Sequence, residues 1–294
     1  MEKVDHYLQS ERLKYDCLIF DLDDTLYPHS SGIADACAKN IREFMVTRLN
    51  IEERKVEEIS DVLYKHYGTT MAGLRAIGYD FDYDEYHSFV HGRLPYERLK
   101  QDLVLRNLLQ SIPLRKIIFT NADRNHAVTA LRKLGLEGCF EGIICFETLN
   151  PTHKHTSSDD EDDAEFVGSE IFTEPNDRIF DIDGFINNSN PSSMLPKTPI
   201  VCKPSESCIK RALKIAEIEN PNRSVFFEDS VRNIQAGKNI GLQTVLVGKS
   251  HRVKGSDYAL ESIHNIREAL PQLWNFNSDV LHSDIVGVET PVSA

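Results

Sequence analysis

Short apolar runs recur along this chain, separated by charged and amphipathic stretches. The first run, residues 17–20, is bounded by charge and predicts a buried parallel strand. Similar runs occupy residues 116–119, 142–146, 224–227 and 242–247. Helical patterns lie between most of them. Because strands and helices alternate, we expect an α/β fold with a doubly wound parallel sheet of the Rossmann-like kind.

The interval after the first strand carries only helical patterns. Residues 33–45 and 56–63 each show apolar residues at helical spacing, and Ser30 or Ser31 is the expected N-cap of the first helix. A glycine-bearing turn within residues 67–74 leads into a third helix. The pattern therefore predicts a small all-helical domain inserted into the α/β core.

The predicted elements also set domain boundaries. We expect the all-helical insert to cover residues 28–105 and the core to comprise residues 1–27 and 106–275. Within the core, residues 259–270 are expected to form a helix. Residues 276–294 carry no clear pattern and are expected to form a loose tail.

One stretch inside the core, residues 151–197, has a different composition. It holds eleven acidic residues against three basic ones, which gives a net charge of −8 out of −13 for the whole chain. A segment so rich in charge cannot bury an apolar core, and we expect it to be disordered.

The composition excludes several classes of protein. A net charge of −13 argues against binding to nucleic acid or to an anionic membrane, because phosphate-rich surfaces require stripes of Lys and Arg. No apolar run is long enough to span a membrane, and the N-terminus lacks the apolar core of a signal peptide. The six cysteines form no Cys-x-x-Cys pair, so free thiols in a reducing compartment are expected. We therefore expect a cytoplasmic protein.

Carboxylates gather directly after the first predicted strand. Asp21 and Asp23 are two residues apart at an extended strand end, so their side chains project in the same direction. Ligands of open α/β sheets bind at such strand ends. Two like charges this close require a cation between them, and a hard divalent metal with oxygen ligands, most simply Mg²⁺, fits best. Taken alone, the cluster is explained more simply as a solvated turn or a helix N-cap.

Polar side chains follow three other apolar stretches in the same way. They are Thr120 and Asn121 after the second strand, Lys203 after the apolar run that begins at residue 199, and Glu228 and Asp229 after residues 224–227, with Asn233 four residues beyond. A hydroxyl and backbone N–H groups at the start of a helix form a phosphate cradle, and a lysine neutralises phosphoryl charge. Each feature singly has a simpler structural explanation, but their order along the chain is specific.

Four features of this chain resemble, in the same order, the four motifs of the haloacid dehalogenase (HAD) superfamily. They are an apolar strand ending in Asp-x-Asp-x-Thr, a strand followed by Thr-Asn, a Lys after an apolar run, and an acidic pair with an Asn. The resemblance implies that Asp21 is a nucleophile forming an aspartyl-phosphate and Asp23 a general acid and base. It further implies that Thr120 and Lys203 take part in catalysis. The metal ligands that it implies for Mg²⁺ are Asp21, Asp23, Glu228 and Asp229. Residues implied to support the substrate or the metal are Thr25, Asn121 and Asn233.

The helical insert has the position of the cap that closes over substrate in this superfamily. Two of its segments, residues 67–74 and 89–95, look like those of pyrimidine 5′-nucleotidase-type members, which implies substrate contacts from Tyr67, Thr70 and His91. We therefore expect a phosphatase acting on a small phosphorylated metabolite, with UMP or CMP as the leading substrates. Alternatives are a sugar-phosphate or phosphoglycolate phosphatase of the same superfamily, a receiver-type signalling module, and a HAD-fold scaffold.

Overall fold

The centre of the molecule is a single sheet of six strands, all parallel, in the order β3-β2-β1-β4-β5-β6. The computed structural model describes residues 14–151, 179–187 and 194–274. The strands are β1 (Cys17–Phe20), β2 (Arg115–Phe119), β3 (Gly142–Ile144), β4 (Ser224–Glu228), β5 (Gln243–Val247) and β6 (Tyr258–Leu260). The fully buried β1 lies between β2 and β4, as a continuous apolar run predicts.

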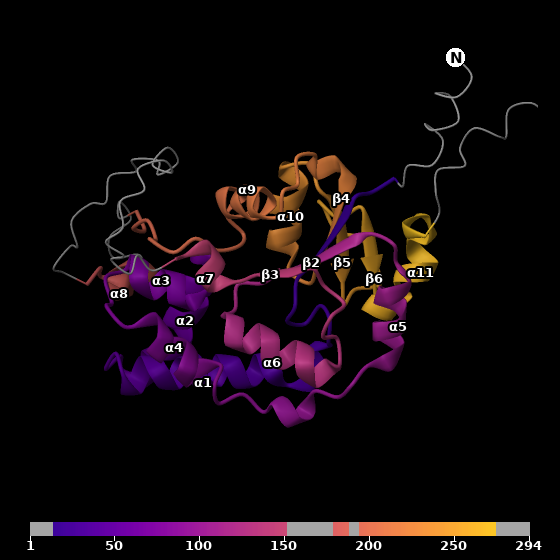
Figure 1. Cartoon of the computed structure of the whole chain (residues 1–294). Coiled ribbons are helices and arrows are strands. Elements are labelled where there is room, and N and C mark those ends of the chain that lie inside the picture. The colour runs from indigo at the N-terminus through magenta and orange to yellow at the C-terminus, as the bar shows by residue number, and fades with distance from the viewer. Residues whose placement is uncertain (1–13, 152–178, 188–193, 275–294) are drawn as a thin grey trace, which may run out of the picture.

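Side chains alternate along β1 and fill two separate cores. Cys17 and Ile19 pack with α9 (Glu206–Ile215) and α10 (Val231–Asn239) on one face. Leu18 and Phe20 point to the other face, where the core includes residues of α5 (Leu103–Ser111), α6 (Arg124–Leu134) and α11 (Ile266–Ala269). Helices thus cover both faces of the sheet (Figure 1), which confirms the predicted doubly wound α/β fold.

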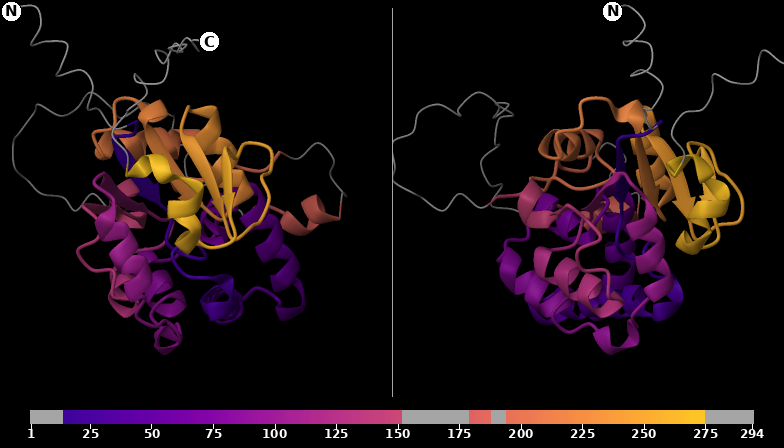
Figure 2. Two further views of the ribbon diagram at one scale, coloured as in Figure 1. Left: turned by 90° about the vertical axis from the view of Figure 1, so that its right-hand side faces the viewer. Right: turned by 45° about the vertical axis from the view of Figure 1, so that its right-hand side comes forward.

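Four of the five α-helices in the interval between β1 and β2 form one group. They are α1 (Ile33–Thr47), α2 (Glu53–Tyr67), α3 (Thr70–Ala76) and α4 (Tyr83–Val90). Figure 2 shows these indigo-to-purple helices lying together on one side of the sheet. They surround a third apolar core in which the buried ring of Phe44 meets three other aromatic rings edge to face. The predicted insert is therefore helical, while its limits at residues 28 and 105 remain a prediction.

The start of α1 differs from expectation. Gly32, in the left-handed conformation with φ 73°, occupies the N-cap position in place of Ser30 or Ser31. Ser31 still accepts a hydrogen bond from the Ile33 N–H at 3.3 Å. A glycine reaches this backbone conformation without steric cost, so the preceding 3-10 turn (His29–Ser31) can run directly into the helix.

Part of the acidic stretch is ordered, contrary to the expectation for residues 151–197. Residues 182–186 form a short helix, α8 (Ile182–Ile186), which Asp181 caps by accepting the N–H of Gly184. Ile182 is buried in the core of the helical insert. The stretch from 179 to 186 is rich in apolar residues and can pack, whereas the charge lies mainly in residues 152–178, which are outside the described residues.

The C-terminal part of the core also differs from expectation. Residues 259–270 do not form one helix: β6 takes up the first two of them, and α11 is only one turn long. The pattern misleads because β6 is short and sits at the edge of the sheet, where three residues carry little periodic signal. The predicted tail, 276–294, lies outside the described residues.

Two further findings bear on the sequence-based expectations. All six cysteines are free thiols, five of them buried. Within the described ranges, the structure contains no helix with the length and apolar character needed to cross a membrane. The remaining helix of the core is the short α7 (Phe146–Leu149), which follows β3.

Candidate active site

The carboxyl ends of the central strands bring the predicted motif residues together. Asp21 directly follows β1, Thr120 directly follows β2, and Glu228 is the last residue of β4. Because these three strands are parallel neighbours, their carboxyl ends share one edge of the sheet. All three side chains are buried, with at most 6% of their surface exposed. Residues separated by two hundred positions thus form one site.

Lys203 lies at the centre of this site and uses all three of its ammonium hydrogens. Its Nζ donates to Asp21 Oδ1 at 2.6 Å, to Glu228 Oε2 at 2.7 Å and to the Phe119 carbonyl at 2.9 Å. Its exposed fraction is only 1%. Burial alone would lower the pKa of this ammonium group, but the two carboxylates outweigh burial and hold the pKa above its ordinary value. Lys203 therefore remains a buried cation.

Three carboxylates surround this single positive charge. One oxygen each from Asp21, Glu228 and Asp229 lies within 4.8 Å of the others. Burial, with the neighbouring Glu228 charge, raises the pKa of Asp21 to about 8. Burial also raises the pKa of Glu228 to about 7 and that of Asp229 to about 6. When all are ionised the cluster is more negative than Lys203 can offset, and an all-oxygen donor set of this charge fits Mg²⁺.

Asp23 belongs to a different part of the site from the three clustered carboxylates. Its Oδ1 accepts a hydrogen bond from the Tyr27 hydroxyl and lies 2.6 Å from His126 Nε2. Burial alone would raise the pKa of Asp23, but His126 and the Tyr27 hydroxyl lower it to about 2. Conversely, Asp23 holds the pKa of the buried His126 above its ordinary value. The predicted metal contact of Asp23 therefore stays a prediction, and its side chain is within hydrogen-bonding distance of His126.

His126 and Tyr27 are site residues that the sequence did not reveal. His126 lies in the first turn of α6, and its Nδ1 is 2.8 Å from the hydroxyl of Tyr96. A lone histidine in an amphipathic helix carries no signal of its own. His126 stands five residues after Asn121, in the first turn of the helix that follows the predicted phosphate cradle. This closeness to the cradle is the only sequence feature that points to His126.

The remaining core residues of the prediction are placed as follows. Thr25 Oγ1 donates to Asp21 Oδ2 at 3.1 Å, so both oxygens of that carboxylate are held. Thr120 Oγ1 accepts the Ala122 N–H at 3.0 Å, within the turn between β2 and α6. Asn233 is half-buried in the first turn of α10.

Asn121 acts on Lys203 through both ends of its amide. Its Oδ1 accepts the backbone N–H of Lys203 at 2.8 Å, and its Nδ2 donates to the carbonyl of the same residue at 3.1 Å. The side chain thereby pins the backbone that carries the buried ammonium group. The resemblance implied only a backbone N–H from this residue.

The three predicted residues of the helical insert lie apart from one another. The Tyr67 hydroxyl donates to the Pro196 carbonyl at 2.7 Å, and the buried Thr70 Oγ1 is 3.3 Å from Ser60 Oγ. The His91 ring centroid lies 4.8 Å from that of His126, which in turn contacts Asp23. Their roles as substrate contacts remain predictions.

Fold and site together define a parallel α/β protein with a carboxylate–lysine site at the carboxyl edge of its sheet and a helical insert after the first strand. No protein-family model matches the chain. Over 132 residues it is 30% identical to Phosphate metabolism protein 8 of Saccharomyces cerevisiae, a match that spans 42% of this chain and only 41% of that protein.

Solved structures show similarity over most of the chain. YfnB from Bacillus subtilis, described as a HAD-hydrolase and bound to magnesium, is 17% identical with a TM-score of 0.47, covering 86% of this chain and 97% of the other. A HAD phosphatase from Thermococcus onnurineus is 13% identical with a TM-score of 0.44, covering 86% and 96%. L-2-haloacid dehalogenase from Xanthobacter autotrophicus is 12% identical with a TM-score of 0.46, covering 88% and 98%. At these values the comparisons do not fix a family for the chain.

Proposed function

We propose that this protein is a HAD-type, Mg²⁺-dependent phosphomonoester hydrolase that acts through an aspartyl-phosphate on Asp21. One observation carries the proposal: Asp21, at the end of the central strand, is ion-paired to the buried Lys203 within a cluster of three carboxylates. A structural ion pair needs one carboxylate for each lysine. A site with three carboxylates and one lysine instead suits a divalent cation and a dianionic phosphate.

In the first step an oxygen of the Asp21 carboxylate bonds to phosphorus while the bond between phosphorus and the ester oxygen breaks. The departing oxygen takes a proton from the Asp23–His126 pair, whose two atoms are 2.6 Å apart. Lys203 offsets the negative charge of both reactants, since carboxylate and phosphate otherwise repel each other. Tyr96 and Tyr27 orient the proton-carrying pair from either side.

In the second step water attacks the phosphorus of the aspartyl-phosphate and gives its proton to Asp23. The bond between phosphorus and Asp21 breaks, and inorganic phosphate leaves. Asp21, Glu228 and Asp229 would hold Mg²⁺, whose positive charge would offset the negative charge of the transferring group and favour the ionised form of Asp21. Thr25 keeps the Asp21 carboxylate oriented in both steps.

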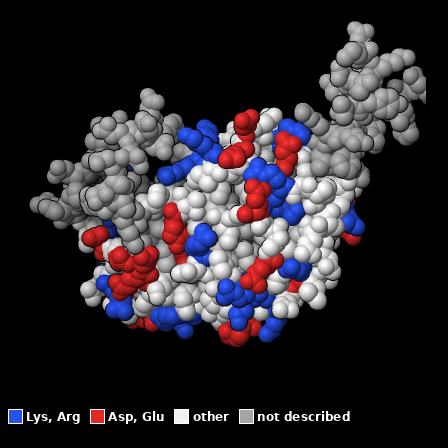
Figure 3. Space-filling model, viewed as in Figure 1, with Lys and Arg blue, Asp and Glu red and all other residues white. Residues whose placement is uncertain are grey.

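For the substrate we propose a small phosphorylated metabolite, with pyrimidine nucleoside 5′-monophosphates (UMP and CMP) first. Two segments of the helical insert support this through their resemblance to pyrimidine 5′-nucleotidase-type proteins, and the name of the yeast relative points to phosphate metabolism. Sugar phosphates and phosphoglycolate are the alternatives. We do not propose a nucleic-acid partner: on the face drawn in Figure 3, Lys and Arg alternate with Asp and Glu and form no basic stripe. The free thiols support a cytoplasmic location.

The test is phosphate release from UMP, CMP, purine monophosphates, sugar phosphates and phosphoglycolate, with Mg²⁺ and with EDTA. We expect Asp21→Asn to abolish turnover, and Asp35→Asn, whose side chain is 78% exposed on α1, to preserve it. Acid-quenched enzyme should carry an acyl phosphate on Asp21 in mass spectrometry. Turnover of another substrate alone contradicts the nucleotide proposal. Folded wild type that binds Mg²⁺ but turns over nothing favours the scaffold or signalling alternatives.

A further inference from the structure

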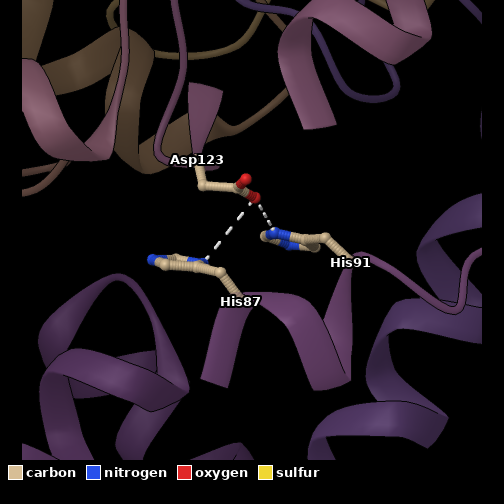
Figure 4. A group of neighbouring side chains, drawn as sticks. All are labelled: His87, His91 and Asp123. Carbon is tan, nitrogen blue, oxygen red and sulfur yellow. Dashed lines mark hydrogen bonds and ion pairs between the residues drawn. The ribbon is translucent and has the colours of Figure 1, made fainter. Parts of the chain in front are cut away.

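A second group of metal-ligating side chains lies where the helical insert meets the core (Figure 4). His87 and His91 come from the C-terminal end of α4, four residues apart on one face, and Asp123 is the N-cap of α6. One ligand atom from each residue lies within 4.8 Å of the other two. His91 Nδ1 is 2.5 Å and His87 Nδ1 3.8 Å from the same oxygen, Asp123 Oδ1. Two imidazoles thus converge on one carboxylate oxygen.

His87 is the unexplained member of this group. Its exposed fraction is 7%, and neither ring nitrogen has a hydrogen-bond partner in the part of the chain that the structure describes. Its ring packs edge to face against Phe146, with centroids 4.6 Å apart. Burying an unpaired polar group is energetically unfavourable, so a bound species at this position would remove that penalty. The hydrogen bond between His91 and Asp123 accounts for His91 but leaves both ring nitrogens of His87 without a hydrogen bond among the described residues.

We propose that His87, His91 and Asp123 bind a divalent transition-metal ion of the Zn²⁺ class. Two imidazole nitrogens and one carboxylate oxygen are a donor set typical of such ions, with water completing the shell. Tetrahedral bonds of about 2.0–2.1 Å place ligand atoms about 3.3 Å apart. The 3.8 Å between His87 Nδ1 and Asp123 Oδ1 is within about 0.5 Å of that value, and the 2.5 Å His91 contact would have to lengthen by about 0.8 Å, with the ion replacing its hydrogen bond.

The carboxylate of Asp123 is already oriented for this role. Its Oδ2 accepts the backbone N–H groups of Asn125 and His126, at 3.0 and 3.3 Å, which leaves Oδ1 facing the two rings. Such supporting hydrogen bonds on a ligand fix its direction and tune its affinity. The histidines belong to the insert and the aspartate to the core, so the bound ion would join the two.

This site shares no residue with the Asp21–Glu228–Asp229 cluster and does not depend on the proposed phosphatase activity. Its donors differ as well: the first cluster offers only oxygen and suits Mg²⁺, whereas imidazole nitrogen prefers first-row transition metals. The nearest link between them is His126, whose ring is 4.8 Å from that of His91 and whose Nε2 contacts Asp23.

The test titrates metal-free full-length protein with Co²⁺, and separately Zn²⁺, in excess Mg²⁺ so that the carboxylate cluster is saturated. We expect one equivalent of Co²⁺ to bind with the visible absorption of nitrogen-ligated Co²⁺, and Zn²⁺ to displace it. His87→Phe and His91→Phe should each weaken binding on the order of 100-fold, at least as much as a lost supporting hydrogen bond. Zn²⁺ should raise the melting temperature of wild type but not of these variants.

Three controls separate this site from others. Asp21→Asn should keep Co²⁺ binding, because it alters only the carboxylate cluster. His264→Phe, at a histidine paired with Asp102 on the surface, should also keep it. His153→Ala with His155→Ala removes the His-Lys-His sequence of the acidic stretch and should have no effect. The proposal is overturned if wild type binds no Co²⁺ or Zn²⁺ under these conditions, if binding survives loss of His87, or if Asp21→Asn abolishes it.

Discussion

Replacing Lys203 by Met tests the electrostatics of the candidate active site most directly. Methionine keeps roughly the length of the lysine side chain but removes the ammonium group and its three hydrogen bonds. The carboxylates of Asp21 and Glu228 are then left buried without their shared cation. Breaking a buried ion pair on one side typically costs about 3–5 kcal/mol, and we expect a loss of that size in the free energy of unfolding at alkaline pH without metal.

The loss should depend on pH in a defined direction. In the wild type the pKa of Asp21 is raised to about 8 and that of Glu228 to about 7, so the folded protein holds these protons more tightly than the unfolded chain. Stability from such groups is present at low pH and falls as pH rises through the folded pKa values. Without Lys203 both pKa values rise further. The deficit of Lys203→Met relative to wild type should therefore be small near pH 5 and grow above about pH 7.

Urea unfolding at several pH values, without added metal, measures this deficit. Lys238→Met is the matched control, because Lys238 pairs with Asp257 at 2.6 Å but is 39% exposed, and a pair of that kind is worth about 1 kcal/mol or less. The reasoning is refuted if Lys203→Met costs no more than Lys238→Met at alkaline pH. A deficit that is larger at acid than at alkaline pH refutes it equally.

Three further changes should be measurable by thermal or urea unfolding. Asn121→Ala removes both hydrogen bonds to the Lys203 backbone and should cost about 1–3 kcal/mol; a neutral result would contradict the pinning role. Gly68→Ala should lower the free energy of unfolding more than Gly138→Ala does. Both glycines have positive φ, which strains an alanine by roughly 1–2 kcal/mol. Of the two, only at Gly68 would the added Cβ also clash with a backbone oxygen, that of Lys203. Phe44→Ala should cost about 3–5 kcal/mol, and less than 1 kcal/mol would mean that the insert has no packed core of its own.

The sequence predicted the parts of the molecule whose signal is local. Strand β1 is fully buried, and a parallel strand in that position must be apolar along its whole length, so it was recognised together with Asp21 behind it. Helix α4 was missed because the apolar residues of 83–90 are mainly aromatic and mixed with charge. Helix α8 was missed because its few apolar residues follow a long acidic stretch.

The parts of the site that could not be predicted are those created by long-range contacts. His126 belongs to the site only through its contact with Asp23, which precedes it by more than a hundred positions. No local sequence pattern around either residue predicts this contact. The same holds for the clamp of Asn121 on the Lys203 backbone. Such side-chain contacts depend on which strands are neighbours in the sheet. A single sequence indicates that strand order only where it carries recognisable motifs.

The place of β1 in the sheet has a consequence for how the chain is made. Synthesis runs from the N-terminus, so β1 leaves the ribosome before its two neighbours, which begin only at Arg115 and Ser224. The helices α1–α4, whose contacts are close in sequence, can pack while the central strand still lacks both partners. Lys203 is made between these two neighbours, and Glu228 is the last residue of β4. The carboxylate cluster therefore cannot form before β4 has been made, and a fragment that stops before β4 cannot contain it.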